Sequence, residues 1–442
     1  MARIARMAKK SAAIFHFRPF SQKQKRAITW WRPESPYHDC DGIIADGAVR
    51  SGKTVAFIVG FILWSSVCFN GQNFILAGKS IGTLKRNVIG PMLLMLRALG
   101  ITYNYNRSEN YIEFGGNTYY MFGANNEASQ DAVQGLTAAG GLLDEVALMP
   151  WSFIDQVMAR CSVDGSKLWF NCNPENPYHQ VKTEIIDKAK DKHFLHLHFT
   201  MEDNLTLSKK TRERYERMFF GVWYKRKVLG QWCAATGAIY DMLDTTRHVI
   251  PDDKIPHINH YFVGCDYGTS SVTTFWLLGI GSDNLYLLDF WTWDAKERQK
   301  QKTDLELTVA LENWLNDKAI VPTWIFIPGD AASFIAQLWQ TKKERQRAGQ
   351  PTPLLHLDVA DRSPGSVLNG IRDVSTLLGA GKLLFAKSIA DRKGLVEMIG
   401  YTWDEKAQAR GEDAPLKEND HSCDAIRYVV VGAKRWWQKL LH

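Results

Sequence analysis

The sequence lacks the cysteine spacing that zinc ribbons and disulfide frameworks need. It has seven cysteines in 442 residues, and no two of them form a C-x-x-C pair. Neither a structural zinc site nor a set of disulfides is therefore expected. A reducing cytosol is the simplest compartment for such a chain.

Long apolar runs are also missing. The most apolar segment, 55–69, is shorter than the roughly 20 residues that a helix needs to cross a bilayer, and it contains Gly60, Ser65 and Ser66. We predict that this segment is a helix of a globular domain. No membrane partner is expected.

Acidic residues are absent from positions 1–33, which contain many Lys and Arg. This composition resembles a transit peptide, but the segment has no apolar signal core, so we interpret it as a solvated basic arm. Phosphate or partner binding by the arm is the alternative. The net charge of the whole chain is +7, which fits a polyanionic partner such as DNA but does not demand one. A hydrophobic content of 45% predicts a folded chain, with room for two or three domains.

The most informative stretch is a complete phosphate-binding loop of the form G-x-x-x-x-G-K-[ST]. The run 42–45 before it is predicted to be a strand and 55–69 after it a helix, which is the context that the motif requires. In such a loop, backbone N–H groups surround a polyphosphate, the lysine contacts the β- and γ-phosphates, and the hydroxyl is offered to Mg²⁺. We predict a nucleotide site, with a structural glycine-rich turn as the alternative. The residues of the loop are Gly47, Ala48, Val49, Arg50, Ser51, Gly52, Lys53 and Thr54.

A predicted strand at 140–145 supplies the acidic part of a nucleotide site. It ends in Asp144 and Glu145, about ninety residues after the loop. Asp144 would hold Mg²⁺ through water, and Glu145 would orient and deprotonate the attacking water.

Two pairs of polar residues each have two interpretations. The strand 167–170 leads into an Asn-Pro turn, where Asn171 or Asn173 is either a γ-phosphate sensor or part of a plain turn. Before the loop, Gln22 or Gln24 stands where many P-loop motors carry a glutamine that reads adenine. The alternative is an ordinary exposed glutamine.

The first half of the chain alternates strands and helices, which predicts a mainly parallel α/β sheet. We expect a strand at 73–77, a helix at 88–99, and a hairpin of 111–114 with 118–122. The region 181–253 differs, because basic and aromatic residues crowd together on predicted helices. Such a mixture can follow a nucleic-acid backbone, and a solvated face over a small aromatic core is the alternative.

From Tyr261 onward, three consecutive strands precede alternating helices and strands. This order describes a second α/β domain of the ribonuclease H type, whose first strand carries a catalytic Asp. Asp266 is that candidate, and Asp330 follows a fourth strand, 324–328, at its carboxyl end.

An apolar helix near the end of the chain opens with DHSCDAIRY, residues 420–428. Spacings of three and four place Asp420 and His421 on the same face as Asp424. A helix that offers Asp424 toward two strand carboxylates can hold two Mg²⁺ or Mn²⁺ ions, which activate water and stabilise the leaving oxygen in phosphodiester cleavage. The alternative is that each Asp is a helix cap or an ion-pair partner.

In this order, the motifs resemble those of the large terminase subunit of tailed bacteriophages, the motor and nuclease that packages viral DNA into a capsid. The resemblance spans nearly the whole chain. It rests on GAVRSGKT, LLDE and NCNP in the first half, and on VGCDYG, the strand ending at Asp330 and DHSCDAIRY in the second. Two further patterns are the segment Gly221 to Trp232 followed by Ile239 and Tyr240, and the set Glu397, Tyr401, Trp403 and Asp404.

The resemblance implies a P-loop ATPase domain of the ASCE type at 1–180, a small helical lid at 181–253, and an RNase H-like nuclease domain at 254–442. Lys53 and Thr54 then resemble the phosphate and Mg²⁺ ligands of the family.

Further roles follow from the same resemblance. Arg50 resembles the P-loop arginine that senses the γ-phosphate, Glu145 the catalytic base, and Asn173 a residue of the motif that couples hydrolysis to lid movement. The nuclease carboxylates would be Asp266, Asp330 and Asp424, with His421 alongside. Asp289 and Asp358 also end apolar runs, so they remain alternatives to Asp330.

The implied function is ATP-driven translocation of double-stranded viral DNA into a procapsid, with metal-dependent endonuclease cutting of concatemeric DNA. The implied cofactors are ATP with Mg²⁺, and Mg²⁺ or Mn²⁺ at the nuclease site. The implied partners are DNA, a small terminase subunit and the portal protein, with a homopentamer at work on the portal in the cytoplasm of the infected bacterium.

Two other functions are weighed against this one. A cellular helicase or repair ATPase with a nuclease domain would be expected to carry further helicase motifs, which are not found. A binding module with a decayed nuclease would have lost Asp266 or Asp424, and both are present.

Overall fold

The computed structural model describes residues 15–392 and 394–441. Within them, the chain folds into two compact units. The first contains residues up to Glu216 with 224–234 and 410–412, and the second contains 217–223, 235–409 and the residues from Asp413 onward. The segment 181–253 is thus divided between the two units, and its action as a lid stays a prediction.

The first unit is built on one large sheet. Its strands are β1 (Gly42–Gly47), β2 (Asn73–Gly78), β3 (Tyr103–Asn106), β4 (Tyr111–Phe114), β5 (Asn117–Gly123), β6 (Gly140–Asp144), β7 (Lys167–Asn171) and β8 (Phe194–Phe199). Within the described residues, the sheet has eight strands in the order β3-β4-β5-β2-β6-β7-β1-β8. Pairing is parallel from β5 to β8, whereas β3, β4 and β5 pair antiparallel.

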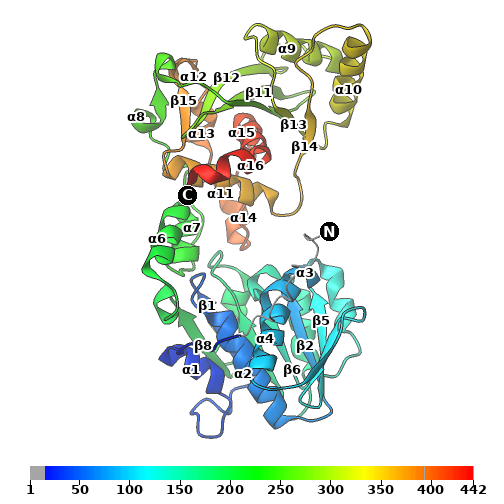
Figure 1. Ribbon diagram of the computed structural model, residues 1–442, viewed down its shortest axis with the longest axis vertical. Helices are drawn as coiled ribbons and strands as arrows, with labels where there is room; N and C mark the ends of the chain where they lie inside the picture. The colour runs from blue at the N-terminus through cyan, green and yellow to red at the C-terminus, as the bar shows by residue number, and fades with distance from the viewer. Residues whose placement is uncertain (1–14, 393, 442) are drawn as a thin grey trace, which may run out of the picture. The chain divides into compact units, whose positions relative to one another are not determined.

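The helical segments of this half of the chain vary in length. They are α1 (Gln22–Thr29), α2 (Lys53–Cys68), α3 (Ile81–Leu84), η1 (Lys85–Ile89), α4 (Gly90–Ala98), η2 (Glu127–Val133), η3 (Val146–Leu148), α5 (Trp151–Arg160), η4 (Val181–Ile186), η5 (Met201–Asp203), α6 (Lys209–Met218) and η6 (Tyr224–Val228). Figure 1 shows α2 and α4 lying against the sheet.

Strand β1 is buried on both faces, which explains its continuous apolar sequence. Ile43 and Ala45 join the core beneath α1, α2 and α4, whereas Ile44 joins the core beneath α5 and η4. The loop that follows β1 is therefore fixed at one end by a fully packed strand.

The predicted strands at 42–45 and 73–77 and the predicted hairpin are present as β1, β2, β4 and β5. The helix predicted at 88–99 is instead divided into the π-helical η1 and the α-helical α4. Pro91 has no N–H to donate toward Asn87, so a regular α-helical turn cannot continue through this point. Strand β3 was not predicted.

The second unit also contains a central sheet. Its strands are β9 (Val249–Ile250), β10 (His260–Asp266), β11 (Val272–Ile280), β12 (Leu285–Asp294), β13 (Trp324–Pro328), β14 (Leu357–Ala360) and β15 (Leu383–Ala386). Within the described part of the chain, they form a seven-stranded sheet in the order β14-β13-β10-β11-β12-β15-β9. The strands β10, β11 and β12 form an antiparallel meander, and β13 and β14 continue the sheet in parallel with β10.

Helices cover both faces of this sheet. They are α7 (Gly221–Trp223), α8 (Thr245–His248), η7 (Asp252–Lys254), α9 (Asp304–Asn316), α10 (Ala332–Arg347), α11 (Ser366–Gly379), α12 (Lys387–Asp391), α13 (Val396–Gly400), α14 (Glu405–Ala409), α15 (His421–Gly432), α16 (Lys434–Trp437) and η8 (Gln438–Leu441). Alternate residues of β10 serve the two faces: Phe262 packs with α11 and α15, and Val263 packs with α9 and α10. Figure 1 shows α15 close to the sheet between α11 and β11. Two sheets, each packed against helices, confirm the predicted α/β fold class.

Gly264 allows α15 to approach β10 closely. A Cβ at this position would lie 2.1 Å from the carbonyl oxygen of Ala425 and 2.8 Å from Cβ of Val429. The absence of a side chain at Gly264 therefore sets the distance between β10 and α15, the two elements that carry Asp266 and Asp424. No helix within residues 15–392 and 394–441 is long and apolar enough to span a membrane.

We expect Gly264→Ala to lower the free energy of unfolding of the second unit by about 1–3 kcal/mol, because the added methyl group overpacks the strand–helix contact. Gly400→Ala is the matched control, since a Cβ at Gly400 meets no atom within 4 Å. Urea unfolding followed by circular dichroism compares the two. Equal stability of both variants would show that α15 can move away from β10 without cost.

Candidate functional site

The phosphate-binding loop leaves the carboxyl end of β1 and runs into α2. Gly47 has a φ of 128°, and a Cβ there would lie 1.9 Å from the carbonyl oxygen of Phe199 in β8. Gly52 has a φ of 85°, and a Cβ there would lie 2.3 Å from Nε2 of Gln24. Both glycines of the motif are therefore required by the backbone conformation and by the close approach of neighbouring groups.

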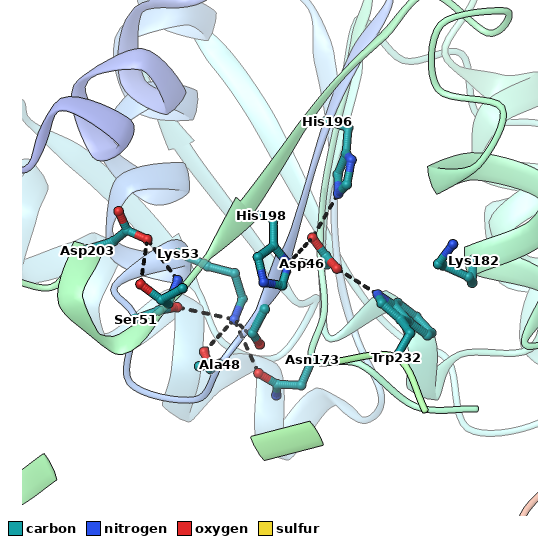
Figure 2. A network of polar contacts seen from close by, with 12 residues as sticks. Asp46, Ala48, Ser51, Lys53, Asn173, Lys182, His196, His198, Asp203 and Trp232 are labelled. Atoms are coloured by element: carbon teal, nitrogen blue, oxygen red, sulfur yellow. Dashed lines mark hydrogen bonds and ion pairs between the residues drawn. The ribbon is translucent and has the colours of Figure 1, made fainter. Parts of the chain in front are cut away.

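Lys53 is buried at the first position of α2, with 6% of its surface exposed. Its Nζ donates to the carbonyl oxygens of Gly47 (2.9 Å) and Ala48 (2.8 Å), to Ser51 Oγ (3.3 Å) and to Asn173 Oδ1 (3.2 Å), as Figure 2 shows. Burial lowers the pKa of Lys53 to about 8. Oxygens of the loop and of the Asn-Pro turn thus surround the Lys53 ammonium group.

The end of β6 brings a carboxylate to the same loop. Thr54 Oγ1 donates to Asp144 Oδ1 at 3.1 Å, and Asn171 Nδ2 donates to the same oxygen at 2.9 Å. Burial raises the pKa of Asp144. Glu145 follows in the left-handed region, with φ 59°, and burial and the adjacent Asp144 charge raise its pKa. Thr54, Glu145, Asn171 and other residues line a cavity of about 430 Å³.

The two remaining predicted nucleotide contacts lie at the edge of this loop. Gln24 is buried in α1, and its Nε2 donates to the carbonyl oxygen of Gly52 at 3.4 Å, whereas Gln22 is exposed. Gln24 also lines a separate cavity of about 240 Å³. The Nε of Arg50 donates to the hydroxyl of Tyr215 in α6 at 2.8 Å.

Asp46, the residue before the loop, forms a network that the sequence analysis missed. Its Oδ1 accepts hydrogen bonds from His196 Nε2 (2.8 Å) and His198 Nδ1 (3.1 Å), and its Oδ2 accepts from Trp232 Nε1 (2.6 Å). Figure 2 shows the three rings converging on this carboxylate. Asp46 is 1% exposed. Burial pushes its pKa upward, but the hydrogen bonds from the two imidazoles outweigh burial and hold the pKa well below the usual range of Asp.

The segment 224–234 contacts the nucleotide loop and the turn that follows β7. The Val49 N–H donates to the carbonyl oxygen of Lys227 at 2.9 Å. Glu175, just beyond the Asn-Pro turn, accepts from Lys227 Nζ at 2.9 Å and from Arg226 Nη1 at 3.3 Å. The predicted coupling turn is therefore joined to this segment by ion pairs.

A second candidate site lies where β10 ends beside the start of α15. Asp266 Oδ2 is 2.8 Å from His421 Nδ1, and the carboxylate raises the pKa of His421. Burial raises the pKa of Asp266, the hydrogen bond from His421 opposes this shift, and the nearby Asp424 charge adds to it. The structure thus brings together three of the predicted residues, Asp266, His421 and Asp424.

Asp424 is enclosed by basic side chains. Its Oδ2 is 3.1 Å from Lys417 Nζ, and its Oδ1 is 2.9 Å from Arg427 Nη2. Lys417 Nζ also lies 2.8 Å from Asp420 Oδ2. Two tyrosine hydroxyls near Asp424, those of Tyr240 and Tyr401, have no hydrogen-bond partner within the part of the chain that the structure describes.

Asp330 does not join this cluster. It follows β13, its side chain is 67% exposed, and it forms an ion pair with Arg362, which raises the pKa of Arg362. Of its two alternatives, Asp289 is paired with Lys318 and Arg392, and Asp358 accepts a hydrogen bond from the N–H of Val359. Among residues 15–392 and 394–441, no three His, Cys, Asp or Glu side chains are grouped closely enough to hold a metal ion.

Comparisons with known proteins find relatives of this chain among large terminases. A family model described as "Terminase large subunit, T4likevirus-type, N-terminal" matches residues 44–247. The large terminase of a thermophilic bacteriophage, in its second crystal form, is 45% identical to this chain, with 94% of this chain and 99% of that chain covered and a TM-score of 0.82. No curated protein matches the sequence.

The same phage protein was also solved with nucleotides. Its complex with ADP is 45% identical, covers 93% of this chain and 98% of that chain, and has a TM-score of 0.77. Its complex with ATP-γ-S is 44% identical, with the same coverage and TM-score.

A P-loop unit with a catalytic-type acidic pair, followed by a ribonuclease H-like unit, defines a motor ATPase joined to a nuclease. At 45% identity over 94% of its length to a solved relative, the chain belongs to the large terminase family of tailed bacteriophages, the DNA-packaging proteins.

We expect Asp46→Asn to lower the free energy of unfolding by about 2 kcal/mol at neutral pH, because three hydrogen bonds lose their charged acceptor. The folded-state pKa of Asp46 lies below the unfolded value of about 3.9. Its stabilising effect is therefore complete above that value and is lost as pH falls through the lower, folded pKa. The gap between wild type and variant should close in acid.

Urea unfolding at several pH values measures this gap. Asp164→Asn is the control, because Asp164 is exposed in the same unit. A variant as stable as the control at pH 7 would contradict the stabilising role of the Asp46 network.

Proposed function

We propose that the first unit hydrolyses ATP to translocate double-stranded DNA and that the second unit cuts this DNA with the help of Mg²⁺ or Mn²⁺. The observation that carries the proposal is the position of the Lys53 ammonium, shared between the loop carbonyls of Gly47 and Ala48 and the side chain of Asn173. A polyphosphate that draws Lys53 away from these oxygens also releases Asn173. A relative 44–45% identical to this chain was solved in complex with ADP and with ATP-γ-S, which supports nucleotide binding by this chain.

The hydrolytic step is assigned to Glu145. Its pKa is raised by burial and by the charge of Asp144, which makes its carboxylate a better proton acceptor than a solvated one. Glu145 takes the proton of the attacking water, while Lys53 stabilises the charge on the phosphates. Arg50 senses the γ-phosphate, and Gln24 contacts the adenine.

The residues at the loop suit Mg²⁺. A hydroxyl and a carboxylate, those of Thr54 and Asp144, lie 3.1 Å apart beside the predicted phosphate position, and hard oxygen donors of this kind are what Mg²⁺ prefers. Thr54 and Asp144 would hold the ion, which would supply positive charge to offset that of the phosphates.

Helix α6 is the proposed contact with DNA phosphates. None of its residues is buried, and its sequence carries Lys209, Lys210, Arg212 and Arg214. This exposure supports phosphate binding without sequence readout. The hydrogen bond between Tyr215 in α6 and Arg50 connects the helix to the nucleotide loop.

The second unit is proposed to use the carboxylates of Asp266, Asp330 and Asp424, with His421 beside Asp266. The donor chemistry suits Mg²⁺ or Mn²⁺, since the donors are carboxylates and the hydroxyls of Tyr240 and Tyr401 beside Asp424 are available as further polar groups. Bound ions would activate water and stabilise the leaving oxygen. His421 orients Asp266 through the hydrogen bond at 2.8 Å.

Membership of the family supports a proposal for the assembly. We propose that the chain works as a homopentamer on the portal protein of the procapsid, with a small terminase subunit and viral DNA as its other partners, in the cytoplasm of the infected bacterium.

We expect Lys53→Ala to abolish ATP turnover through loss of phosphate binding, and Glu145→Gln to reduce kcat by at least about a hundredfold while nucleotide still binds. Phosphate release measures turnover, and a fluorescent ADP analogue measures binding. Lys192→Ala, at an exposed position of the same unit, should behave as wild type. Full turnover by Glu145→Gln would exclude Glu145 as the base.

We expect the protein to cut supercoiled plasmid in Mg²⁺ or Mn²⁺, because two of the carboxylates are already close together. Lys53→Ala should cut as wild type does, whereas Asp266→Asn and Asp424→Asn should not. Gel electrophoresis of the plasmid distinguishes these results. Cutting by either Asp variant at the wild-type rate would refute the assignment of that carboxylate.

A further inference from the structure

Lys417 occupies an unusual place beside the carboxylate cluster of the second unit. Its Nζ bridges two carboxylates, at 2.8 Å from Asp420 Oδ2 and 3.1 Å from Asp424 Oδ2. The Lys417 side chain is 58% exposed, whereas those of Asp420 and Asp424 are each 12% exposed. A long, solvent-accessible cation therefore covers two nearly buried anions.

The second cation at Asp424 is held differently. Arg427 Nη2 lies 2.9 Å from Asp424 Oδ1, and the Arg427 side chain is 4% exposed. Its guanidinium carbon lies 4.5 Å from the centre of the Tyr428 ring, and its stem packs over Gly370, where an added Cβ would come within 2.4 Å. Arg427 is thus fixed by packing, and Lys417 is the cation that can leave.

Each oxygen of Asp424 lies at ion-pair distance from one of these two basic groups. A divalent ion bound by Asp424 needs at least one oxygen; Oδ1 is buried, and Oδ2 is the oxygen that Lys417 contacts. The ion and the ammonium carry like charges, so they cannot share that oxygen at contact distance without a large repulsion. Binding of one must therefore weaken binding of the other.

The surrounding charges explain why a cation is needed at this point. Asp266, Asp420 and Asp424 lie within electrostatic range of one another, since the charges of both Asp420 and Asp424 act on Asp266. Buried carboxylates that repel each other are costly unless a positive charge offsets them. Lys417 supplies that charge from the chain itself.

We propose that Lys417 is an internal competitor of the divalent ion for Asp424 and sets the metal concentration at which the carboxylate cluster takes up an ion. This inference rests on the proposed nuclease function. It also accounts for the grouping of two of the acidic residues, because Lys417 contacts both Asp420 and Asp424.

The test measures Mn²⁺ binding to the full chain in the absence of DNA and nucleotide. The electron paramagnetic resonance signal of free Mn²⁺ reports how much of the ion remains unbound. Binding that is lost in Asp424→Asn is assigned to the cluster. Lys417→Met keeps the length and the apolar stem of the side chain but removes the charge. We expect it to bind Mn²⁺ at least about tenfold more tightly than wild type, since a charge about 3–4 Å from the ion site is removed.

Two control variants separate the charge from the side chain's other roles. Lys434→Met is matched, because the Lys434 ammonium lies 2.6 Å from a different nearly buried carboxylate, that of Asp373. It should bind Mn²⁺ as wild type does. Lys417→Arg keeps the positive charge and should restore weak binding. Urea unfolding of each variant verifies that the fold is retained.

The two hypotheses fail in different ways. If wild type binds Mn²⁺ through Asp424 with the same affinity as Lys417→Met, the competition is refuted while the metal site remains. If neither protein binds Mn²⁺ in a way that Asp424→Asn abolishes, both the metal site and the competition are overturned.

Discussion

The buried ammonium of Lys53 is the constraint on which the architecture of the first unit depends. A cation with 6% exposure must be surrounded by oxygens, and the chain provides them by wrapping the loop between β1 and α2 and by placing Asn173 at the end of β7. The glycines at 47 and 52 exist because no other residue allows this wrapping. The order of the strands matters for the same reason, since β6 and β7 must end beside the loop to deliver Asp144 and Asn173.

Local chemistry explains which parts of this arrangement were predictable. The loop, the apolar strand before it and the acidic pair at 144 and 145 are each encoded by adjacent residues, so the sequence motif suffices to predict them. The Asp46 network is not local: His196 lies 150 positions away and Trp232 lies 186 positions away. Only the pairing of β1 with β8 brings the histidines to Asp46, and no motif records that pairing. The alternation of two histidines in β8 was the one available signal.

The carboxylate site of the second unit was predictable to a lesser degree. The positions of Asp266 at a strand end and of His421 and Asp424 on one helix face followed from periodicity, and the structure brings these three residues together. The partners of the carboxylates were predictable only in part: Arg427 lies three residues after Asp424 on the same helix, whereas Lys417 and Arg362 reach Asp424 and Asp330 from segments outside the helices and strands. Asp289 ended an apolar run as convincingly as Asp330 did, and its ion pairs with Lys318 and Arg392 are formed by residues distant in the sequence.

The return of residues 224–234 to the first unit, after seven residues of the second, has a consequence for how this protein can be divided. The ATP-binding half is not one continuous piece of chain. A fragment cut after Glu216 would keep every residue of the phosphate-binding motif, yet it would lose the Trp232 indole from Asp46 and the Lys227 carbonyl from Val49. Separating the two units by a cut at this point would therefore damage the first unit, although the cut lies far from the motif in sequence.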